Sequence, residues 1–182
     1  LLGISSVPTD HELNMGMPGM HGMAYNNLAI DEADLLIALG MRFDDRITGR
    51  LRDFAPNAKV VHVDVDASEV NKNVKATAPV VGDLKHVLNQ LLPLVEPNVH
   101  IDWHRRLDEL KSQHPSLNIR ETEELLPQYV LNRLSEVTHG DCIVVTGVGQ
   151  HQMWAAQHCK FNSPNTLIPS GGLGTMGFEV PA

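Results

Sequence analysis

Three short apolar segments, each closed by glycine or aspartate, constrain the fold of this chain more than any other feature. They are residues 35–40 (LLIALG), 60–66 (VVHVDVD) and 79–83 (PVVGD). Apolar and β-branched runs of this length are typical of buried strands in a parallel sheet. Residues 84–95 follow with leucine and valine at helical spacing. The alternation of strand, turn and helix predicts an α/β fold with a parallel sheet.

A second α/β unit is predicted in the last third of the chain. Helical spacing over residues 126–138 ends at Gly140-Asp141, and an apolar strand follows at 142–146. The pattern then predicts a helix over 150–158 and a strand over 166–169.

Between these units the sequence becomes polar and contains two prolines, with one short helix expected over residues 103–113. We therefore expect one domain part at residues 1–96, a connector at 97–124 and the start of a second domain at 125–182. The chain begins without a signal peptide and ends on residues 178–182, which resemble the opening of a helix, so we expect an internal piece of a longer protein.

Composition excludes several classes of function. With 42% hydrophobic and 20% charged residues the chain has the make-up of a soluble globular protein, and it lacks the apolar run of roughly 20 residues that spans a membrane. A net charge of -8 with scattered basic residues disfavours nucleic acid as a partner. The two cysteines form no CxxC pair, and the ten histidines fall in no HxxxH or HExxH pattern, so we predict no metal site.

The ends of the three predicted strands are the first place where chemistry is expected. A glycine there lets a ligand approach the backbone, Arg42 and Arg46 could bind a diphosphate, and Asp64 could bind a ribose or ribityl hydroxyl. A dinucleotide is one interpretation. The other is that the glycines and aspartates are turn residues and that residues 44–46 form a solvated loop. The residues alone leave both open.

A small-residue turn at residues 146–152 (TGVGQHQ) lies between a strand and a helix and is typical of an anion site, because the free N–H groups of a helix start face the ligand. Gln150 and His151 could also be ordinary polar residues of a first helical turn. Residues 172–177 match G-x-G-x-x-G, but this match is uninformative without a following strand that ends in an acid. No Ser/His/Asp or Cys/His set is visible, so we predict no catalytic residue in this chain.

Four segments together resemble the catalytic subunit of the acetohydroxyacid (acetolactate) synthase family. They are residues 19–22 (GMHG), 42–49 (RFDDRITG), 147–157 (GVGQHQMWAAQ) and 170–178 (SGGLGTMGF). The resemblance implies the later half of a central, Rossmann-like FAD-binding domain, followed by the start of a thiamine-diphosphate-binding domain. Residue 18, residue 23 and residue 179 depart from the family pattern, and the carboxylate of Glu179 would repel a nearby diphosphate.

The resemblance implies specific cofactor contacts in each half. Those expected for FAD, in a structural and not a redox role, are Met20, His21, Gly22, Gly40, Met41, Arg42, Asp44, Arg46, Asp64, Val65 and Asp83. Those expected for thiamine diphosphate are Val148, Gly149, Gln150, His151, Gly174 and Met176.

The family reaction decarboxylates pyruvate and joins the product to a second 2-keto acid, pyruvate or 2-ketobutyrate, in branched-chain amino-acid biosynthesis. It needs thiamine diphosphate, Mg²⁺ and FAD, and the activating glutamate and the metal motif would lie outside these residues. The family also implies a homodimer or tetramer with a small regulatory subunit, in the cytoplasm or in a eukaryotic organelle. Alternatives are a pyruvate oxidase, a glyoxylate carboligase, or a nucleotide-binding module without catalysis. We expect the chain alone to be inactive and to bind FAD weakly or not at all.

Overall fold

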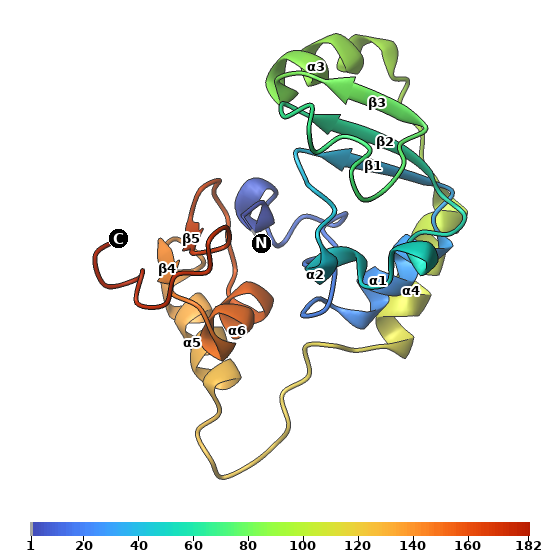
Figure 1. Ribbon diagram of the computed structural model, residues 1–182. Coiled ribbons are helices and arrows are strands. Elements are labelled where there is room, and N and C mark those ends of the chain that lie inside the picture. The colour runs from blue at the N-terminus through green and yellow to red at the C-terminus, as the bar shows by residue number, and fades with distance from the viewer. Residues whose placement is uncertain (1) are drawn as a thin grey trace. The chain divides into compact units, whose positions relative to one another are not determined.

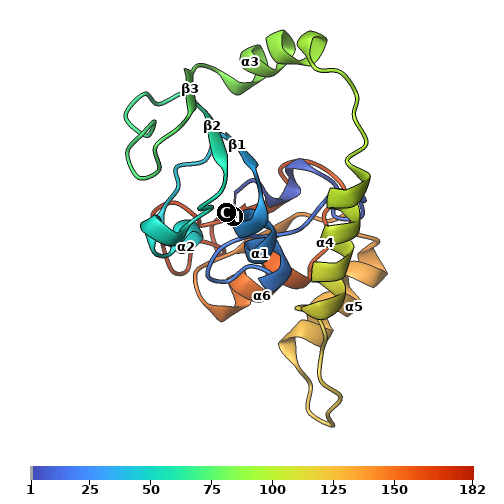
Figure 2. The ribbon, with the colours of Figure 1, turned by 90° about the vertical axis from the view of Figure 1, so that its right-hand side faces the viewer.

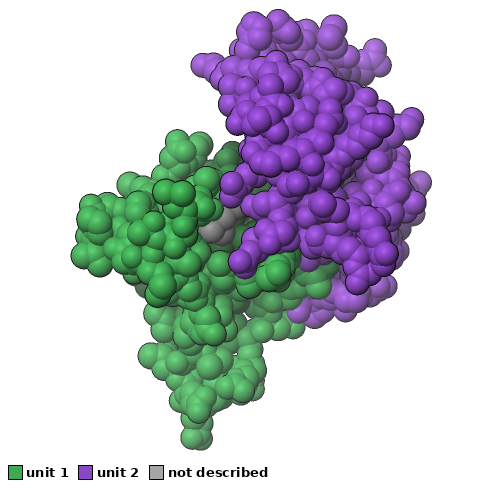
Figure 3. Space-filling view, in the orientation of Figure 1, with its two compact units in different colours: residues 1–26, 116–182 green, residues 27–115 purple. Residues whose placement is uncertain are grey.

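A computed structural model describes residues 2–182 and divides the chain into two compact units. One unit combines the N-terminal residues up to 26 with residues 116–182, and the other contains residues 27–115 (Figure 3). Both contain parallel strands with helices between them, which confirms the predicted α/β class.

The unit of residues 27–115 is built on a three-stranded parallel sheet in the order β1-β2-β3 (Figure 1). Its strands are β1 (Leu35–Leu39), β2 (Lys59–Asp64) and β3 (Ala78–Val81). The helical elements around them are α1 (Ala24–Glu32), which begins in the other unit, α2 (Asp45–Thr48), a 3₁₀ turn (Leu51–Asp53), α3 (Leu84–Leu91), a second 3₁₀ turn (Leu92–Leu94) and α4 (Ile101–Gln113).

One face of this sheet carries the core of the unit. Ala38, Phe43, Val60 and Ala76 are buried together there. On β1 the alternation of side chains sends three apolar residues to the opposite face. Leu35, Ile37 and Leu39 remain 49%, 48% and 40% exposed. The interpretation of residues 35–40 as a strand is confirmed, and in this structure only one of its faces is covered.

Helix α4 is tied to the end of α1 by a bidentate ion pair. The guanidinium of Arg106 donates to both carboxylate oxygens of Glu32, at 2.6 and 2.7 Å. These hydrogen bonds hold the pKa of Glu32 below its usual range. Leu110, on the same helix, is 1% exposed. The short helix expected over residues 103–113 is confirmed, and it begins two residues earlier, at Ile101.

The other unit contains a two-stranded parallel sheet, labelled in Figure 1, and helices over residues 127–138 and 150–158, which Figure 2 labels α5 and α6. Its elements are a 3₁₀ turn (Ile4–Ser6), α5 (Pro127–Thr138), β4 (Val144–Thr146), α6 (Gln150–His158) and β5 (Leu167–Pro169). Ala155, Cys159, Phe161 and Leu167 form the core between α6 and the sheet.

The N-terminal segment is joined to this unit by backbone pairing over a long sequence distance. The amide of Thr9 donates to the carbonyl oxygen of Phe161 at 2.9 Å. The amide of Phe161 in turn donates to the hydroxyl of Thr9, also at 2.9 Å. Phe161 itself is fully buried. The unit is therefore discontinuous in sequence.

Several elements differ from the sequence-based expectation for identifiable reasons. The helix expected over 84–95 ends at Leu91 and tightens into a 3₁₀ turn, because Pro93 cannot donate to the helical ladder. Residues 178–182 form turns and not a helix start, since Pro181 disfavours helical backbone at the residue before it. Helices α1 and α2 were not predicted, because their apolar residues lack clear helical spacing. Within residues 2–182 no helix is long and apolar enough to cross a membrane.

Candidate functional site

The carboxyl ends of β1, β2 and β3 lie side by side and bring together most of the expected FAD contacts. The amide of Gly40 donates to the carbonyl oxygen of Val63 at 2.8 Å, and the amide of Gly82 donates to that of Asp64 at 2.9 Å. Gly40, Asp64 and the residues beside Gly82 therefore share one sheet edge. Ligands of open α/β sheets bind at this edge.

Gly40 leaves this edge open. Its φ is +63°, a backbone conformation that glycine adopts readily, and a Cβ placed there would meet nothing within 4 Å. Val65, after the end of β2, is 75% exposed. The backbone next to these two residues is accessible to a ligand.

Two arginines follow β1, Arg42 in the loop and Arg46 in α2, and each lies beside a carboxylate. Arg42 Nε lies 3.6 Å from Asp44 Oδ2, and Arg46 Nε lies 4.0 Å from Asp45 Oδ2. The arginine side chains are 57% and 67% exposed, and such surface pairs contribute little to stability. Both arginines can therefore turn to an anionic ligand at small cost. Asp44 Oδ1 is buried and has no hydrogen-bond partner among the described residues.

The remaining aspartates at this edge shape the backbone. Asp64 Oδ1 accepts from the amide of Asp66 at 2.9 Å. Asp83 is the N-cap of α3, and its Oδ1 accepts from the amide of His86 at 3.0 Å. Asp83 keeps a second carboxylate oxygen for a ligand hydroxyl, whereas Asp64 Oδ2 lies 3.9 Å from Nε2 of the buried His62.

Sequence reasoning missed a histidine that shapes this loop. His62 is fully buried in β2, and its Nε2 lies 2.8 Å from the carbonyl oxygen of Met41. Asn73 donates to the carbonyl oxygen of Phe43 at 2.9 Å and holds the loop further along. The sequence indicates this role only by the position of His62 inside the β-branched segment of residues 60–66, where a buried histidine needs a hydrogen-bond partner.

The three other expected FAD contacts lie in the unit of residues 1–26 and 116–182, in a tight loop. The amide of Gly22 donates to the carbonyl oxygen of Gly19 at 3.0 Å, and that of Met23 donates to the carbonyl oxygen of Met17 at 2.9 Å. A Cβ at Gly22 would overlap the carbonyl oxygen of Met17. Met20, at the tip, is 64% exposed.

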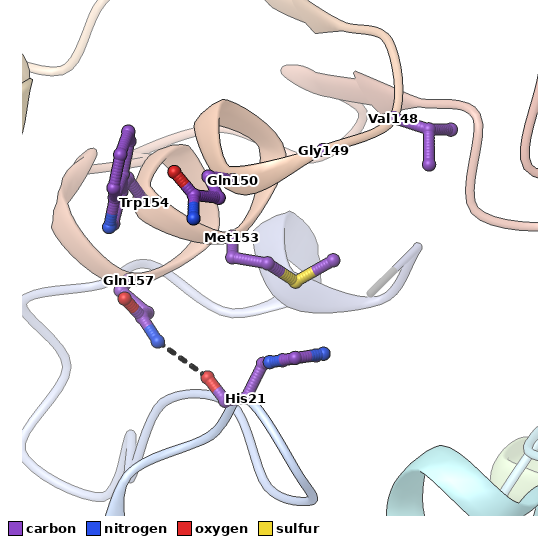
Figure 4. Close-up of a pocket in the computed structure, with 7 residues that line it drawn as sticks. All are labelled: His21, Val148, Gly149, Gln150, Met153, Trp154 and Gln157. Carbon is purple, nitrogen blue, oxygen red and sulfur yellow. Dashed lines mark hydrogen bonds between the residues drawn. The ribbon is translucent and has the colours of Figure 1, made fainter. Parts of the chain in front are cut away.

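A pocket of about 430 Å³ lies between this loop and α6, within the same unit (Figure 4). Its lining residues are His21, Val148, Gly149, Gln150, Met153, Trp154 and Gln157. It therefore joins one expected FAD contact to three expected thiamine diphosphate contacts. Sequence reasoning missed Met153, Trp154 and Gln157, although with Gln150 they follow the spacing of one helix face.

The start of α6 provides anion donors. Gly149 is the N-cap with φ 150°, a conformation that favours glycine, and the first N–H groups of a helix have no partner within it. These N–H groups fit a phosphate. His151, Gly174 and Met176 do not line the pocket, and Met176 is 78% exposed.

One side chain does not fit a diphosphate. The carboxylate of Glu179 lies against the buried Gly147, where a Cβ would overlap it. Its Oε2 is buried and, like the hydroxyl of Thr146, has no hydrogen-bond partner among the described residues. The donors of the turn thus fit an anionic cofactor, whereas Glu179 has to turn away to admit it.

Titratable groups give no metal site in the part of the chain that the structure describes. No three His, Cys, Asp or Glu side chains among residues 2–182 lie close enough together to hold an ion.

A parallel sheet with an open carboxyl edge, and a helix start whose free N–H groups fit a phosphate, are features of the class of α/β proteins that bind phosphate-containing cofactors. Comparison with known families agrees. Residues 1–91 match the central domain of thiamine pyrophosphate enzymes, and residues 147–182 match their C-terminal TPP binding domain. The chain belongs to the thiamine pyrophosphate enzyme family.

The most informative relatives are similar over the whole chain. It is 46% identical to the acetolactate synthase of Mycobacterium leprae and to the chloroplastic acetolactate synthase 1 of Nicotiana tabacum, over 100% of its length. It is 45% identical to the acetolactate synthase large subunit IlvB1 of Mycobacterium tuberculosis. The chain spans 28–31% of the length of these relatives.

Proposed function

We propose that this chain is part of an acetolactate synthase, referred to below as the parent protein. The parent decarboxylates pyruvate and joins the two-carbon product to a second 2-keto acid, pyruvate or 2-ketobutyrate, in the synthesis of branched-chain amino acids. The observation that carries the proposal is similarity at 44–46% identity along the entire chain, across both candidate cofactor sites, to bacterial and plant acetolactate synthases.

In this proposal the start of α6 holds the diphosphate of thiamine diphosphate. Val148, Gly149, Gln150 and His151 contribute backbone N–H groups and side-chain donors, and Gly174 and Met176 contact the rest of the cofactor. Thiamine diphosphate, when bound, supplies the nucleophilic carbon and the electron sink that decarboxylation of a 2-keto acid requires. The pocket beside α6 contributes apolar side chains from Met153 and Trp154 that can pack against the bound cofactor.

FAD is proposed to bind at the sheet edge and at the loop of residues 19–22 in a structural role. The open backbone at Gly40, the exposed side chains of Arg42 and Arg46 and the second carboxylate oxygen of Asp83 support this assignment. The unpartnered Oδ1 of Asp44 also suits a hydroxyl donor of the ligand.

Mg²⁺ is proposed to be held by parts of the parent outside this chain. A homodimer or tetramer of catalytic subunits with a small regulatory subunit is proposed as the assembly, in line with the "large subunit" named for one relative. The parent is proposed to be cytoplasmic, or organellar in a eukaryote, as the chloroplastic plant relatives suggest.

The alternative enzymes, pyruvate oxidase and glyoxylate carboligase, are disfavoured because the relatives with high identity are named acetolactate synthases. A module without catalysis is disfavoured for the same reason.

A carboligation assay on the parent tests the proposal. Pyruvate is supplied with thiamine diphosphate, Mg²⁺ and FAD, and acetolactate is measured after its conversion to acetoin. We expect acetolactate to form and to be lost without thiamine diphosphate. Release of acetaldehyde or acetate without acetolactate would contradict the proposal and favour another thiamine-dependent activity.

A further inference from the structure

The loop of residues 17–23 is rigid by its own hydrogen bonds. Two backbone bonds close it, from Gly22 to Gly19 at 3.0 Å and from Met23 to Met17 at 2.9 Å. The side chain of Asn26 donates to the carbonyl oxygens of Met15 and Gly16 at 3.2 and 3.0 Å and secures the segment that enters the loop. These hydrogen bonds hold the loop in one conformation.

The base of this loop is packed on α6. Met17 and Met23 are 6% and 4% exposed and form a buried cluster with Ala156 of that helix. The tip, in contrast, projects outward, because Met20 is 64% exposed. Apolar packing at the base holds the loop on the helix but provides no directional contact with residues 19–22.

A directional contact lies one residue further along α6. The side-chain amide of Gln157 donates to the carbonyl oxygen of His21 at 2.6 Å (Figure 4). Gln157 belongs to the same helix face as Gln150, Met153 and Trp154, so its side chain reaches the loop across the end of the pocket. This bond joins the loop to the helix whose first turn carries the thiamine diphosphate motif.

We propose that Gln157 is a positioning residue that sets the orientation of the loop of residues 19–22 relative to α6. The side chain of Gln157 contacts the proposed FAD site through the backbone carbonyl oxygen of His21. Its amide holds that carbonyl, and the loop therefore presents Met20 and His21 to the flavin in one orientation. The inference rests on the proposed function, which assigns this loop to FAD and the start of α6 to thiamine diphosphate.

The test compares variants of the parent protein that lose the donor in two ways. Gln157→Met keeps the length of the side chain without its donor, and Gln157→Asn keeps an amide that is one methylene too short to reach. Gln113→Met, at the exposed end of α4 in the other unit, is the matched control. Flavin fluorescence titration of the apoprotein gives the FAD dissociation constant, and visible circular dichroism of the bound flavin reports the surroundings of its ring.

We expect both Gln157 variants to bind FAD roughly five- to tenfold more weakly, which is the range for loss of one well-aligned hydrogen bond. The visible circular dichroism of the residual bound flavin should change, while the melting temperature of the apoprotein stays close to that of the wild type. The Gln113→Met control should match the wild type in all three measurements.

An FAD dissociation constant within twofold of wild type in both Gln157 variants, with an unchanged flavin spectrum, would overturn the inference. Failure of both variants to fold would also overturn it, because the bond would then be needed for the fold as a whole. Failure of the proposed function looks different, since the wild-type parent would then form no acetolactate from pyruvate, whatever its affinity for FAD.

Discussion

His62 Nε2, buried in the middle of β2, lies 2.8 Å from the carbonyl oxygen of Met41 in the loop after β1. Because a carbonyl only accepts, Nε2 carries the proton, and Nδ1 is left buried without a partner among the described residues. The ring also contacts Phe43 edge to face, with centroids 5.0 Å apart. The side chain of His62 thus connects β2, the loop after β1 and the aromatic core next to the proposed FAD site.

Replacing this histidine should destabilise the protein. His62→Leu leaves the carbonyl of Met41 without its donor, and we expect the free energy of unfolding to fall by about 1–3 kcal/mol. Denaturant unfolding of the parent protein measures it. His100→Leu, at an exposed histidine without a side-chain cap bond, is the control. Equal stability of the two variants would show that the Met41 carbonyl finds another donor.

Glu179 is expected to weaken thiamine diphosphate binding in this protein. Its carboxylate lies against Gly147, next to the donors proposed for the diphosphate, and like charges at close range repel. Glu179→Gln removes the charge and keeps the shape, so we expect the cofactor to bind roughly five- to tenfold more tightly. Calorimetric titration of the apo parent with thiamine diphosphate and Mg²⁺ measures it. Glu123→Gln, at an exposed position, serves as the control, and tighter binding there would point to net charge instead.

A methyl group at Gly22 should disrupt the loop of residues 17–23. A Cβ there would overlap the carbonyl oxygen of Met17, which already accepts a hydrogen bond from Met23. We expect Gly22→Ala to cost about 1–3 kcal/mol of stability, the usual effect of overpacking, together with loss of FAD affinity. Gly172→Ala adds the same methyl where nothing lies within 4 Å, and it should be neutral. Comparable melting temperatures for the two variants would contradict the tight loop.

Burial should protect Cys159 from alkylation. Its side chain lies in the core of the unit, and burial raises the pKa of the thiol to about 11. Since only the thiolate reacts, iodoacetamide should modify Cys159 very slowly in the folded parent at pH 8, and rapidly after unfolding in urea. Peptide mass spectrometry of both samples measures the difference. Equal rates in the two samples would show that the thiol is accessible.

The same pKa gives a sign for the dependence of stability on pH. The thiol in the unfolded chain has its ordinary, lower pKa and loses its proton first as the pH rises. Above that value, ionisation of the thiol stabilises the unfolded state but not yet the folded state. The contribution of Cys159 to stability is therefore present at neutral pH and is lost as the pH rises toward about 11. Replacing Cys159 with alanine should flatten this part of the pH profile.

The sequence predicted the elements that have a strong period and clear ends. Helix α6 has the predicted limits, residues 150–158, and β1 and β5 differ from the expected strands by one residue. Helix α1 was missed because asparagines and small residues interrupt its apolar face. Elements with a strong sequence pattern could thus be located from the sequence. The other elements depend on tertiary contacts that the local pattern does not contain.

The parts of the candidate sites that backbone geometry creates could be predicted from the sequence. The parts that depend on side chains far away in the chain could not. Strand ends and a helix start can be located from the sequence, so Gly40, Asp64 and Gly149 were identified as candidates. Gln157 and His62 act through contacts with residues 136 and 21 positions away in the chain. Without an alignment or a structure, no local pattern distinguishes such a residue from an ordinary polar or packing residue.

The mutual hydrogen bonds of Thr9 and Phe161 have a consequence for the order in which the chain acquires structure during synthesis. All of residues 27–115 leave the ribosome before Phe161 does, so their unit can form from contiguous sequence while Thr9 still waits for its partner. Closing so long a loop is entropically costly and makes folding slow. Until Ala156 and Phe161 are synthesised, Met17 and Met23, which the folded unit buries, stay exposed on the nascent chain.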